Sequence, residues 1–218
     1  MEPTQNRPFQ NKKRYLWAFI IGTAIFALVF IISNSIAFLE FQKVSNIQDS
    51  LAYKIFEDKI YASFFNQSIC TDNSLQNLSQ DLGFQGQIID DMEKKFGKND
   101  PQVLDRKKFY TLVELEHLEF IQAQIKNCNL SMNTILFFYS NKDPDLERST
   151  EIGRLLNEVY LKEPDKITIY SFDINLDSDL IRSLLQKYNV TQSPTLIING
   201  NATVTEPIRI ENVQKYLF

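Results

Sequence analysis

The sequence of 218 residues predicts an α/β protein with a transmembrane helix at its N-terminus and a helical hairpin before its C-terminal domain. Three observations support this fold class. A long apolar run near the N-terminus lacks charged residues. Residues 74–127 repeat apolar side chains at intervals of three and four, the spacing of an amphipathic helix. From residue 133 onward, short apolar stretches alternate with amphipathic ones, which is typical of alternating strands and helices.

The apolar run extends from Tyr15 to Leu39 without a charged residue. About 20 apolar residues suffice to cross a bilayer, so we expect a single-pass transmembrane helix over 15–39. Positive residues stay on the cytoplasmic side, and the run is preceded by Arg7, Lys12, Lys13 and Arg14. We therefore expect residues 1–14 to be a basic cytoplasmic tail at the cell membrane, with everything after the helix extracytoplasmic.

A cleaved signal peptide is the alternative interpretation of the same run. Ser33-Asn-Ser35 has the small-x-small pattern of a cleavage site. However, apolar residues continue beyond this site through Leu39, and the whole run exceeds the usual apolar core of a signal peptide. This length favours an uncleaved anchor.

Residues 40–130 are expected to form a juxtamembrane helix and then a helical hairpin. The apolar spacing predicts helices over 40–69, 74–97 and 101–127. Gly97 and Pro101 mark the hairpin turn, because glycine favours the residue after a helix and proline favours the first helical position.

The only two cysteines, Cys70 and Cys128, lie equally far from the hairpin turn centred on Asn99. Two antiparallel helices of equal length bring both sulfurs to the open end of the hairpin. We expect a structural disulfide there, which would stabilise the fold by up to about 4 kcal/mol. A redox-active pair is the alternative, but it requires an exposed thiolate of low pKa, which the neighbouring residues do not favour.

Residues 131–218 are expected to form a C-terminal domain with the element order βαβαββα. The expected strands cover 134–139, 166–173, 195–198 and 203–205, and the expected helices cover 145–161, 178–188 and 210–218. Asn199-Gly200-Asn201 is a strong hairpin signal between the last two strands. This order predicts a mixed sheet with a parallel first half and an antiparallel second half.

Three stretches of this domain resemble the thioredoxin-like superfamily. Ile135-Leu-Phe-Phe-Tyr-Ser140 is similar to the first core strand of that fold, and Phe172-Asp-Ile-Asn175 to the end of its second strand. Tyr188-Asn-Val-Thr-Gln-Ser-Pro-Thr-Leu-Ile-Ile-Asn-Gly200 is similar to the cis-proline loop and the hairpin after it. The resemblance implies a thioredoxin-like fold over residues 131–218, with Pro194 as the cis-proline.

The chain departs from this family where active members carry a Cys-x-x-Cys motif. In those proteins a helix N-terminus lowers the pKa of the first cysteine. The corresponding residues here fall within Lys142-Asp-Pro-Asp-Leu146, which has no cysteine. Asp143, Pro144 and Asp145 have residue types that start a helix: a cap, a first-turn proline and an acid near the helix dipole. The dithiol chemistry of the family is therefore not expected in this domain.

The resemblance also implies a peptide-binding position. In this fold the residue before the cis-proline presents backbone groups to an extended peptide. Ser193, Pro194 and Thr195 are therefore candidate peptide-binding residues. The alternative is that Pro194 only shapes a turn that belongs to the fold.

Other residue types argue against several kinds of site. The net charge of −4 and the lack of a basic stripe argue against a nucleic-acid partner. His117, the sole histidine, is expected to be a solvated helix residue rather than a metal ligand, because metal sites need several ligands. We expect neither a metal nor a cofactor, since no glycine-rich phosphate loop occurs.

Asn-x-Ser/Thr sequons are candidate glycosylation sites after the anchor, at Asn66, Asn77, Asn129, Asn189 and Asn201. Asn189 and Asn201 also suit turns, which is a simpler explanation for these two.

These observations favour a membrane-anchored extracytoplasmic protein whose redox-inactive thioredoxin-like domain binds, folds or assembles other proteins. Two alternatives remain open: a thiol–disulfide oxidoreductase that uses Cys70 and Cys128, and a structural spacer in an envelope complex. The missing dithiol motif favours a non-enzymatic role, but that role rests on the resemblance of the fold.

Overall fold

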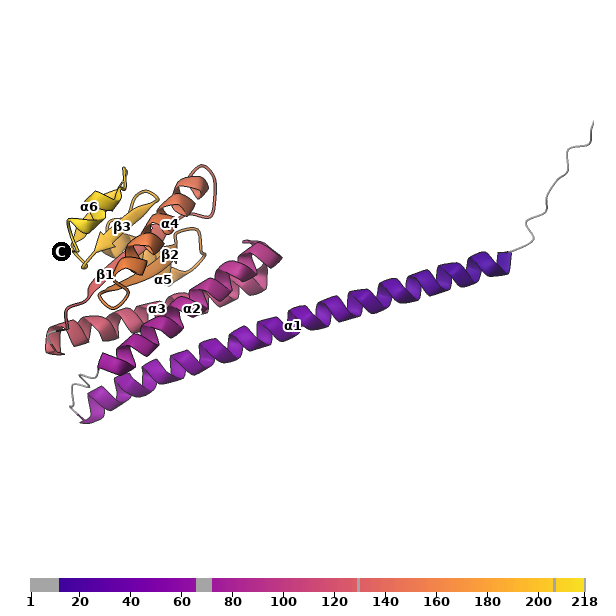
Figure 1. Ribbon diagram of the computed structural model, residues 1–218, viewed down its shortest axis with the longest axis horizontal. Coiled ribbons are helices and arrows are strands. Elements are labelled where there is room, and N and C mark those ends of the chain that lie inside the picture. Colours follow the sequence, from indigo (N-terminus) through magenta and orange to yellow (C-terminus); the bar gives the residue numbers. More distant parts are fainter. Residues whose placement is uncertain (1–11, 66–71, 129, 206, 218) are drawn as a thin grey trace, which may run out of the picture. The chain divides into compact units, whose positions relative to one another are not determined.

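The computed structural model describes residues 12–65, 72–128, 130–205 and 207–217, and the chain divides into two compact units, residues 1–44 and residues 45–218. The structure is mostly helical, with a mixed four-stranded sheet near the C-terminus (Figure 1). The helices are α1 (Lys12–Phe65), α2 (Asp72–Phe96), α3 (Pro101–Cys128), α4 (Leu146–Lys162), α5 (Asp179–Lys187) and α6 (Ile210–Gln214). The strands are β1 (Asn133–Tyr139), β2 (Ile167–Asp173), β3 (Thr195–Ile198) and β4 (Ala202–Thr205).

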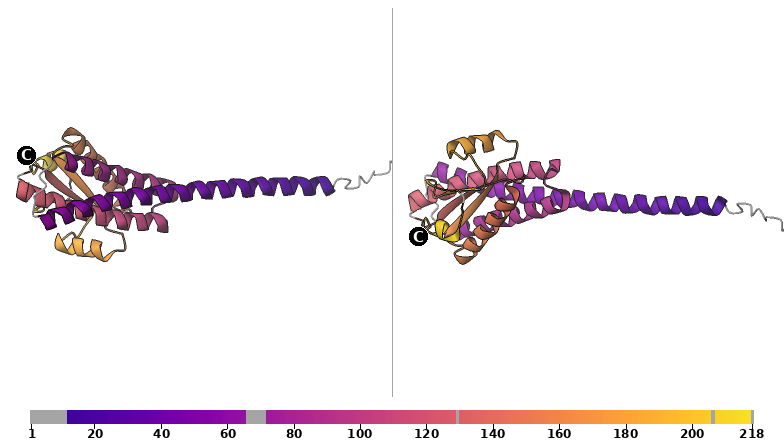
Figure 2. Two further views of the ribbon diagram at one scale, coloured as in Figure 1. Left: turned by 90° about the horizontal axis from the view of Figure 1, so that it is seen from below. Right: turned by 90° about the horizontal axis from the view of Figure 1, so that it is seen from above.

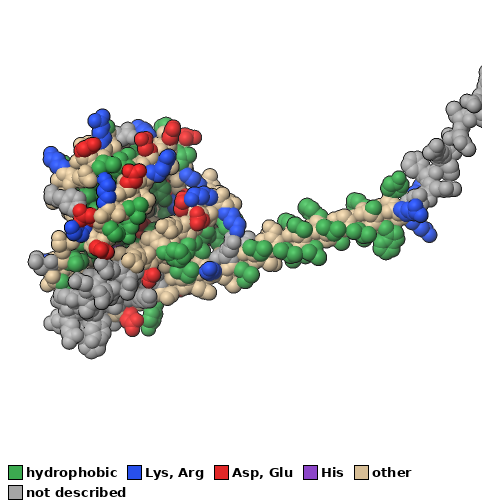
Figure 3. Space-filling view, in the orientation of Figure 1, with side chains coloured by type: hydrophobic (Ala, Val, Ile, Leu, Met, Phe, Trp, Pro, Cys, Tyr) green, Lys and Arg blue, Asp and Glu red, His purple; other side chains and the backbone are tan. Residues whose placement is uncertain are grey.

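Helix α1 runs without a break over 54 residues, so the expected membrane span and the expected juxtamembrane helix are one element. Among the described residues, α1 is the one helix long and apolar enough to cross a membrane. Large apolar side chains are exposed along its N-terminal part, including Phe19 and Phe26 (Figure 3). The side chains of Thr23, Asn34 and Ser35 donate hydrogen bonds to carbonyls of the helix itself, at 2.9, 3.0 and 2.8 Å. These polar side chains are therefore satisfied without water.

The part of α1 in the second unit packs on α2 and α3 through polar as well as apolar contacts. Ile55 is 1% exposed and belongs to a core that it shares with α2, α3 and the sheet. The Gln85 amide donates a hydrogen bond to the Ile47 carbonyl at 3.2 Å. The Gln48 amide donates to the Arg106 carbonyl at 3.3 Å, and the Arg106 guanidinium donates back to Gln48 Oε1 at 3.4 Å. Polar contacts within an otherwise apolar helix seam fix the register of α1 against the hairpin.

The turn between α2 and α3 has the predicted chemistry. Gly97 directly follows α2 and has a φ of 96°, in the left-handed region that favours glycine. Pro101 is the first residue of α3. Asp100 caps this helix, because its Oδ1 accepts the N–H groups of Gln102 at 2.9 Å and Val103 at 3.2 Å. The reversal of the chain is therefore determined locally by these residues.

The four strands form one mixed sheet in the order β2-β1-β3-β4. β1 and β2 are parallel, and their register places Tyr139 beside Asp173 at the C-terminal ends of both strands. β3 is antiparallel to β1 and to β4. Asn199 and Gly200, with φ of 53° and 75°, form the turn between β3 and β4, as the Asn-Gly signal predicts.

Helices cover both faces of the sheet (Figure 2). One face contributes Phe138, Tyr170 and Phe172, each 0% exposed, to the core that also contains side chains of α2, α3 and α5. The opposite face forms a second core with α4 and α6, which includes Ile135 and Leu156. The hairpin therefore shares a core with the sheet.

The two glycines of α2 differ in their surroundings, which allows a matched test of the contact between α2 and α3. A Cβ at Gly86 would lie 2.9 Å from the Tyr110 hydroxyl, which donates a hydrogen bond to the Leu82 carbonyl at 3.0 Å. A Cβ at Gly83 would meet nothing within 4 Å.

Gly83→Ala should raise the free energy of unfolding by about 0.5–1 kcal/mol, because alanine is the better helix former. Gly86→Ala should lower it by about 1 kcal/mol, because the new methyl group displaces the Tyr110 hydroxyl from its hydrogen bond. Urea unfolding followed by circular dichroism measures both changes. Equal effects of the two substitutions would contradict this close approach of α3 to Gly86.

Candidate functional site

The candidate site lies where β1 and β2 end. Because the two strands are parallel, their C-terminal ends meet at one edge of the sheet. Ser140 and Asn141 follow β1, Asp173 ends β2, and Asn175 follows shortly after. In the fold that the sequence resembles, the end of this first strand leads into the Cys-x-x-Cys motif.

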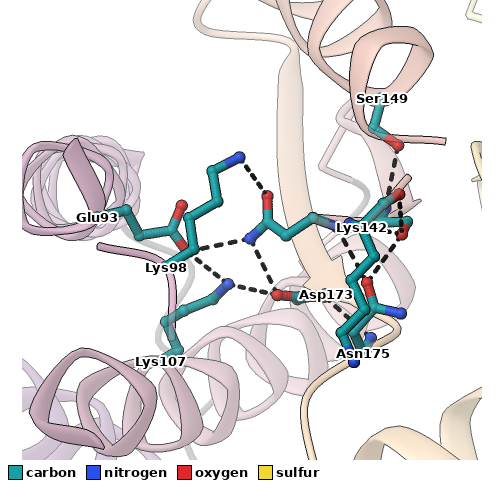
Figure 4. Close-up of polar contacts among 9 residues, drawn as sticks. Glu93, Lys98, Lys107, Lys142, Ser149, Asp173 and Asn175 are labelled. Atoms are coloured by element: carbon teal, nitrogen blue, oxygen red, sulfur yellow. Dashed lines mark hydrogen bonds and ion pairs between the residues drawn. The ribbon is translucent and has the colours of Figure 1, made fainter. Parts of the chain in front are cut away.

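Side chains tie the two strand ends together (Figure 4). Ser140 Oγ donates a hydrogen bond to Asn175 Oδ1 at 2.8 Å, and the N–H of Asn141 donates to the same oxygen at 3.1 Å. The N–H of Asn175 donates to Asp173 Oδ1 at 2.9 Å. Ser149 of α4 accepts the N–H of Ser140 at 3.0 Å. The loop after β1 is therefore held both by the neighbouring strand end and by the following helix.

The α2–α3 hairpin places a buried lysine at the same strand ends. Lys107 of α3 lies with its Nζ 2.6 Å from Glu93 Oε1 of α2 and 2.5 Å from Asp173 Oδ2 of β2. All three side chains are between 5% and 9% exposed. One cation thus joins two helices to the edge of the sheet.

Asn141 connects the loop after β1 to this ion pair. Its amide nitrogen donates hydrogen bonds to Glu93 Oε1 and Asp173 Oδ2, both at 3.1 Å. Its amide oxygen accepts a hydrogen bond from Lys98 Nζ, in the hairpin turn, at 3.0 Å. We call Glu93, Lys98, Lys107, Asn141 and Asp173 the β1-end cluster.

One lysine lies between two carboxylates in the buried centre of the β1-end cluster. Burial alone lowers the pKa of Lys107, but nearby acidic groups outweigh it and raise that pKa above its usual range. Tyr139 attracts the lysine only when its phenol is ionised, and burial raises the pKa of that phenol far above neutrality. At neutral pH the carboxylates of Asp173 and Glu93 therefore keep Lys107 protonated.

The β1-end cluster suits a structural role better than a catalytic one. A lysine acts as a nucleophile or a base only when it is neutral, and here it is held protonated. The side-chain amide of Asn141 is engaged at both its nitrogen and its oxygen. The hairpin therefore occupies and fastens the strand end from which a redox motif would act.

A second polar contact fastens α3 to β2 further along the same helix. Glu114, 1% exposed, accepts the N–H of Ser171 through Oε1 at 2.7 Å. β2 is an edge strand of the sheet, and this N–H points away from β1, because alternate residues of a strand direct their N–H groups to opposite sides. Glu114 thus satisfies a backbone group on an edge that would otherwise be open.

His117 is fully buried, which corrects the expectation of a solvated residue. Its Nδ1 lies 2.8 Å from the Tyr170 hydroxyl of β2, and its Nε2 lies 3.3 Å from Ser79 Oγ of α2. The expectation was wrong because His117 and Glu114 lie on the polar part of α3 that faces the sheet. Sequence periodicity detects only apolar contact faces.

Burial shifts the protonation of both groups toward their neutral forms. It raises the pKa of Glu114 well above its ordinary value, although the Ser171 N–H and the charge of Lys107 oppose this shift. Burial also lowers the pKa of His117 to about 4. α3 therefore presents to β2 a carboxyl whose charged form is disfavoured and, at neutral pH, a neutral imidazole.

Helix α4 begins at Leu146, one residue after the expected start, and its cap lies two residues after the expected Asp143. Asp145, rather than Asp143, is the N-cap residue, and its side chain makes no capping hydrogen bond. Asp143 and Pro144 lie in a preceding turn, which is closed by a hydrogen bond from the Asp145 N–H to the Lys142 carbonyl at 3.1 Å. The peptide bond between Asp143 and Pro144 is cis. The cap prediction failed because it treated each residue type separately and did not account for this turn.

The candidate peptide-binding residues have their side chains inside the protein. Ser193 and Thr195 are 7% and 1% exposed, and the peptide bond between Ser193 and Pro194 is cis. Ser193 Oγ lies 3.3 Å from Ser149 Oγ, and Thr195 Oγ1 donates to the Gln192 carbonyl at 2.8 Å. These side chains shape the loop from within, so any contact with a peptide would use backbone groups.

The remaining candidate residues are only partly described. Cys128 ends α3, but Cys70 lies outside the described residues, so their disulfide stays a prediction. Among the sequons, Asn66 and Asn129 also lie outside the described residues. Asn77 lies within α2, whereas Asn189 and Asn201 are exposed at turns. Glycosylation at these positions stays a prediction.

Sequence reasoning missed most of the β1-end cluster. Its expected member is Asp173 at the end of β2, which the resemblance singles out together with the nearby Asn175. Lys107 and Glu93 are charged, so the apolar periodicity did not reveal them. On α3, Glu114 follows Lys107 by seven residues, and His117 follows Glu114 by three. That spacing places them on one face of a helix, and it was the available clue.

No protein-family model matches the sequence, and no curated protein matches it. Among solved structures, thioredoxin O2 from Arabidopsis thaliana in the oxidized state is similar at 23% identity, over 45% of this chain and 83% of that chain, with a TM-score of 0.33. A similarity at this TM-score is too weak to establish a shared fold. The strand order, the strand directions and the cis-proline before β3 nevertheless agree with what the resemblance to the thioredoxin fold implies.

Removing the central cation should destabilise the protein strongly. Lys107→Met leaves Glu93 and Asp173 buried without a counter-charge, so the free energy of unfolding should fall by about 3–5 kcal/mol. The exposed neighbour Lys108 provides the control, and Lys108→Met should change it by less than about 0.5 kcal/mol. Urea unfolding at pH 7 measures both values. Similar losses in the two variants would contradict a buried ion pair.

Glu114 should make the stability depend on pH. Its pKa is raised in the folded state. Its contribution to the free energy of unfolding is therefore fully present below 4.5, the pKa in the unfolded state, and is lost as the pH rises. Glu114→Gln removes this loss, so the variant should gain stability relative to the wild type between pH 5 and pH 8. The exposed Glu119, changed to Gln, is the control. Unfolding free energies across this range test the sign, and a difference independent of pH would contradict it.

Proposed function

We propose that the chain is a single-pass membrane protein whose thioredoxin-like domain lies outside the cytoplasm and is not an oxidoreductase. In this proposal the domain binds extended segments of other proteins and assists their folding or assembly at the membrane surface. The N-terminus is cytoplasmic, and the C-terminal unit is held near the membrane by α1.

The β1-end cluster carries this proposal. In an active member of the resembled family, the end of the first strand must present a reactive thiolate to substrate. Here the equivalent loop holds Asn141, whose side chain is engaged by Lys98, Glu93 and Asp173. The closure of this strand end by the hairpin supports a scaffold that has kept its fold without its dithiol chemistry.

The properties of α1 support the anchor. Its apolar stretch has the length that a bilayer requires, and the polar side chains within that stretch bond to the helix itself. The basic residues that precede the stretch support a cytoplasmic N-terminus.

The loop before β3 is the proposed peptide-binding position. Thr191 and Gln192 are exposed at this loop, while Ser193 and Thr195 shape it from inside. A partner would add an extended segment along the exposed backbone, a mode that gives affinity through main-chain hydrogen bonds. The partner is therefore expected to be an unfolded or extended polypeptide.

Thiol chemistry provides the first test. The full chain in lipid nanodiscs should neither reduce insulin nor reoxidise reduced ribonuclease above the rate of buffer alone. The double variant Cys70→Ser, Cys128→Ser should behave in the same way. Activity of the wild type that disappears in this variant would overturn the proposal and identify an oxidoreductase that uses these two cysteines.

Site-directed crosslinking provides the second test. A photoreactive amino acid at Gln192 should form adducts with an added unfolded polypeptide, such as reduced and alkylated ribonuclease. The same group at the exposed Lys162, at the end of α4, is the control and should form few adducts. Equal yields at the two positions would contradict binding at the loop before β3.

A further inference from the structure

His117 lies where three elements of the second unit meet. It belongs to α3 and is 0% exposed. One ring nitrogen contacts the Tyr170 hydroxyl of β2 at 2.8 Å, and the other contacts Ser79 Oγ of α2 at 3.3 Å. The imidazole therefore joins both helices of the hairpin to the edge strand of the sheet.

The surroundings of His117 favour a neutral ring. Tyr170 of β2 is the titratable group that contacts the ring, α2 presents the hydroxyl of Ser79, and Glu114 precedes His117 by three residues on α3. Burial raises the pKa of both Glu114 and Tyr170, which disfavours the negative charge that an imidazolium needs beside it. The charged groups of the β1-end cluster gather around Lys107, ten residues before His117 on α3.

We propose that His117 is an acid-sensitive latch: when its ring takes up a proton, the α2–α3 hairpin loosens from β2 and uncovers the end of β1. This inference rests on the proposed function, because it treats the hairpin as the cover of that strand end. A proton added to the buried ring creates a charge without a counter-charge, which an open hairpin would expose to water. The covered and open forms thus differ in their affinity for one proton.

The other contacts between α3 and β2 link His117 to the end of β1. Three polar side chains of α3 bond to β2. Lys107 contacts Asp173, Glu114 contacts Ser171, and His117 contacts Tyr170. Successive contacts along α3 meet earlier and earlier residues of β2. The helix and the strand therefore run antiparallel and share one line of contacts. Loosening at His117 therefore weakens the line that ends at the β1-end cluster.

The direction of the pH effect follows from the lowered pKa. His117 has a pKa of about 4 when the hairpin is closed and 6.5 when it is exposed, so the open form binds the proton more tightly. Protonation of His117 therefore destabilises the closed form as the pH falls from 6.5 towards 4, by up to about tenfold in the opening constant for each pH unit, whereas Glu114 acts in the opposite direction. The chain has 1 histidine, so a difference caused by replacing it reports on this position alone.

Hydrogen exchange of the Ser171 amide tests the latch, because that N–H is protected by Glu114 of α3. The full chain in nanodiscs is compared between pH 6.5 and pH 4.5. Exchange rates are expressed as protection factors, which corrects for the pH dependence of the intrinsic exchange rate. Relative to His117→Gln, the wild type should lose protection by up to about tenfold for each pH unit, because the opposite effect of Glu114 is present in both proteins. His117→Gln, which keeps a hydrogen-bonding side chain but cannot titrate, should lose markedly less.

Tyr170→Phe is the matched control, because it removes the hydrogen bond of His117 but leaves the titrating ring in place. It should lower protection at every pH while keeping the acid dependence of the wild type. Should His117→Gln fail to fold, His117→Asn takes its place with the same expected outcome. The same acid dependence in the wild type and the histidine variant would overturn the latch.

Different experimental results would contradict the latch and the proposed function. Protection of Ser171 that depends on His117 supports the latch, whatever the Gln192 crosslinks show. Missing crosslinks at Gln192 would remove peptide binding but leave the opening of the hairpin measurable. Conversely, crosslinking with pH-independent protection would keep the function and remove the latch.

Discussion

The ion pair of Lys107 with Glu93 and Asp173 is the constraint on which the rest of the second unit depends. Each of these charges would cost several kcal/mol if it were buried alone, so the three must meet wherever the hairpin docks. This requirement fixes α2 and α3 against the end of β2. Asn141 then extends the same contact to the end of β1, because its amide bonds to both carboxylates. One buried cation thereby sets the position of two helices, two strand ends and a loop.

Further polar contacts fasten the same edge of the sheet. Ser140, Asn141 and Asn175 join the end of β1 to the end of β2. Along the same helix, Glu114 satisfies a backbone N–H on the edge of β2, and His117 joins that edge to α2. The polar contacts position the hairpin, whereas the shared apolar core supplies most of the stabilisation. A hairpin positioned by titratable groups can also respond to protons.

The sequence predicts the elements well because each has a local physical cause. Gly97, Asp100 and Pro101 determine the hairpin turn, and Asn199 with Gly200 determines the turn between β3 and β4. The start of α4 was placed too early, because the turn through Asp143 and Pro144 competes with the helix. The site itself was largely hidden. Lys107 and Glu93 are far apart in the sequence from Asp173, and whether charged residues are paired and buried or lie on the surface is decided only by tertiary packing.

A double-mutant cycle between Lys107 and Asp173 tests most directly whether a buried ion pair closes the end of β1. Unfolding free energies are measured for Lys107→Met, Asp173→Asn and the double variant at pH 7. The account predicts a coupling energy above about 2 kcal/mol, because Lys107→Met leaves two buried carboxylates without a counter-charge, but only one when Asp173 is already Asn. The exposed pair Lys94 and Asp90, 2.6 Å apart, is the control and should couple far more weakly, because solvent screens it. Additive effects of the Lys107 and Asp173 changes would contradict the account.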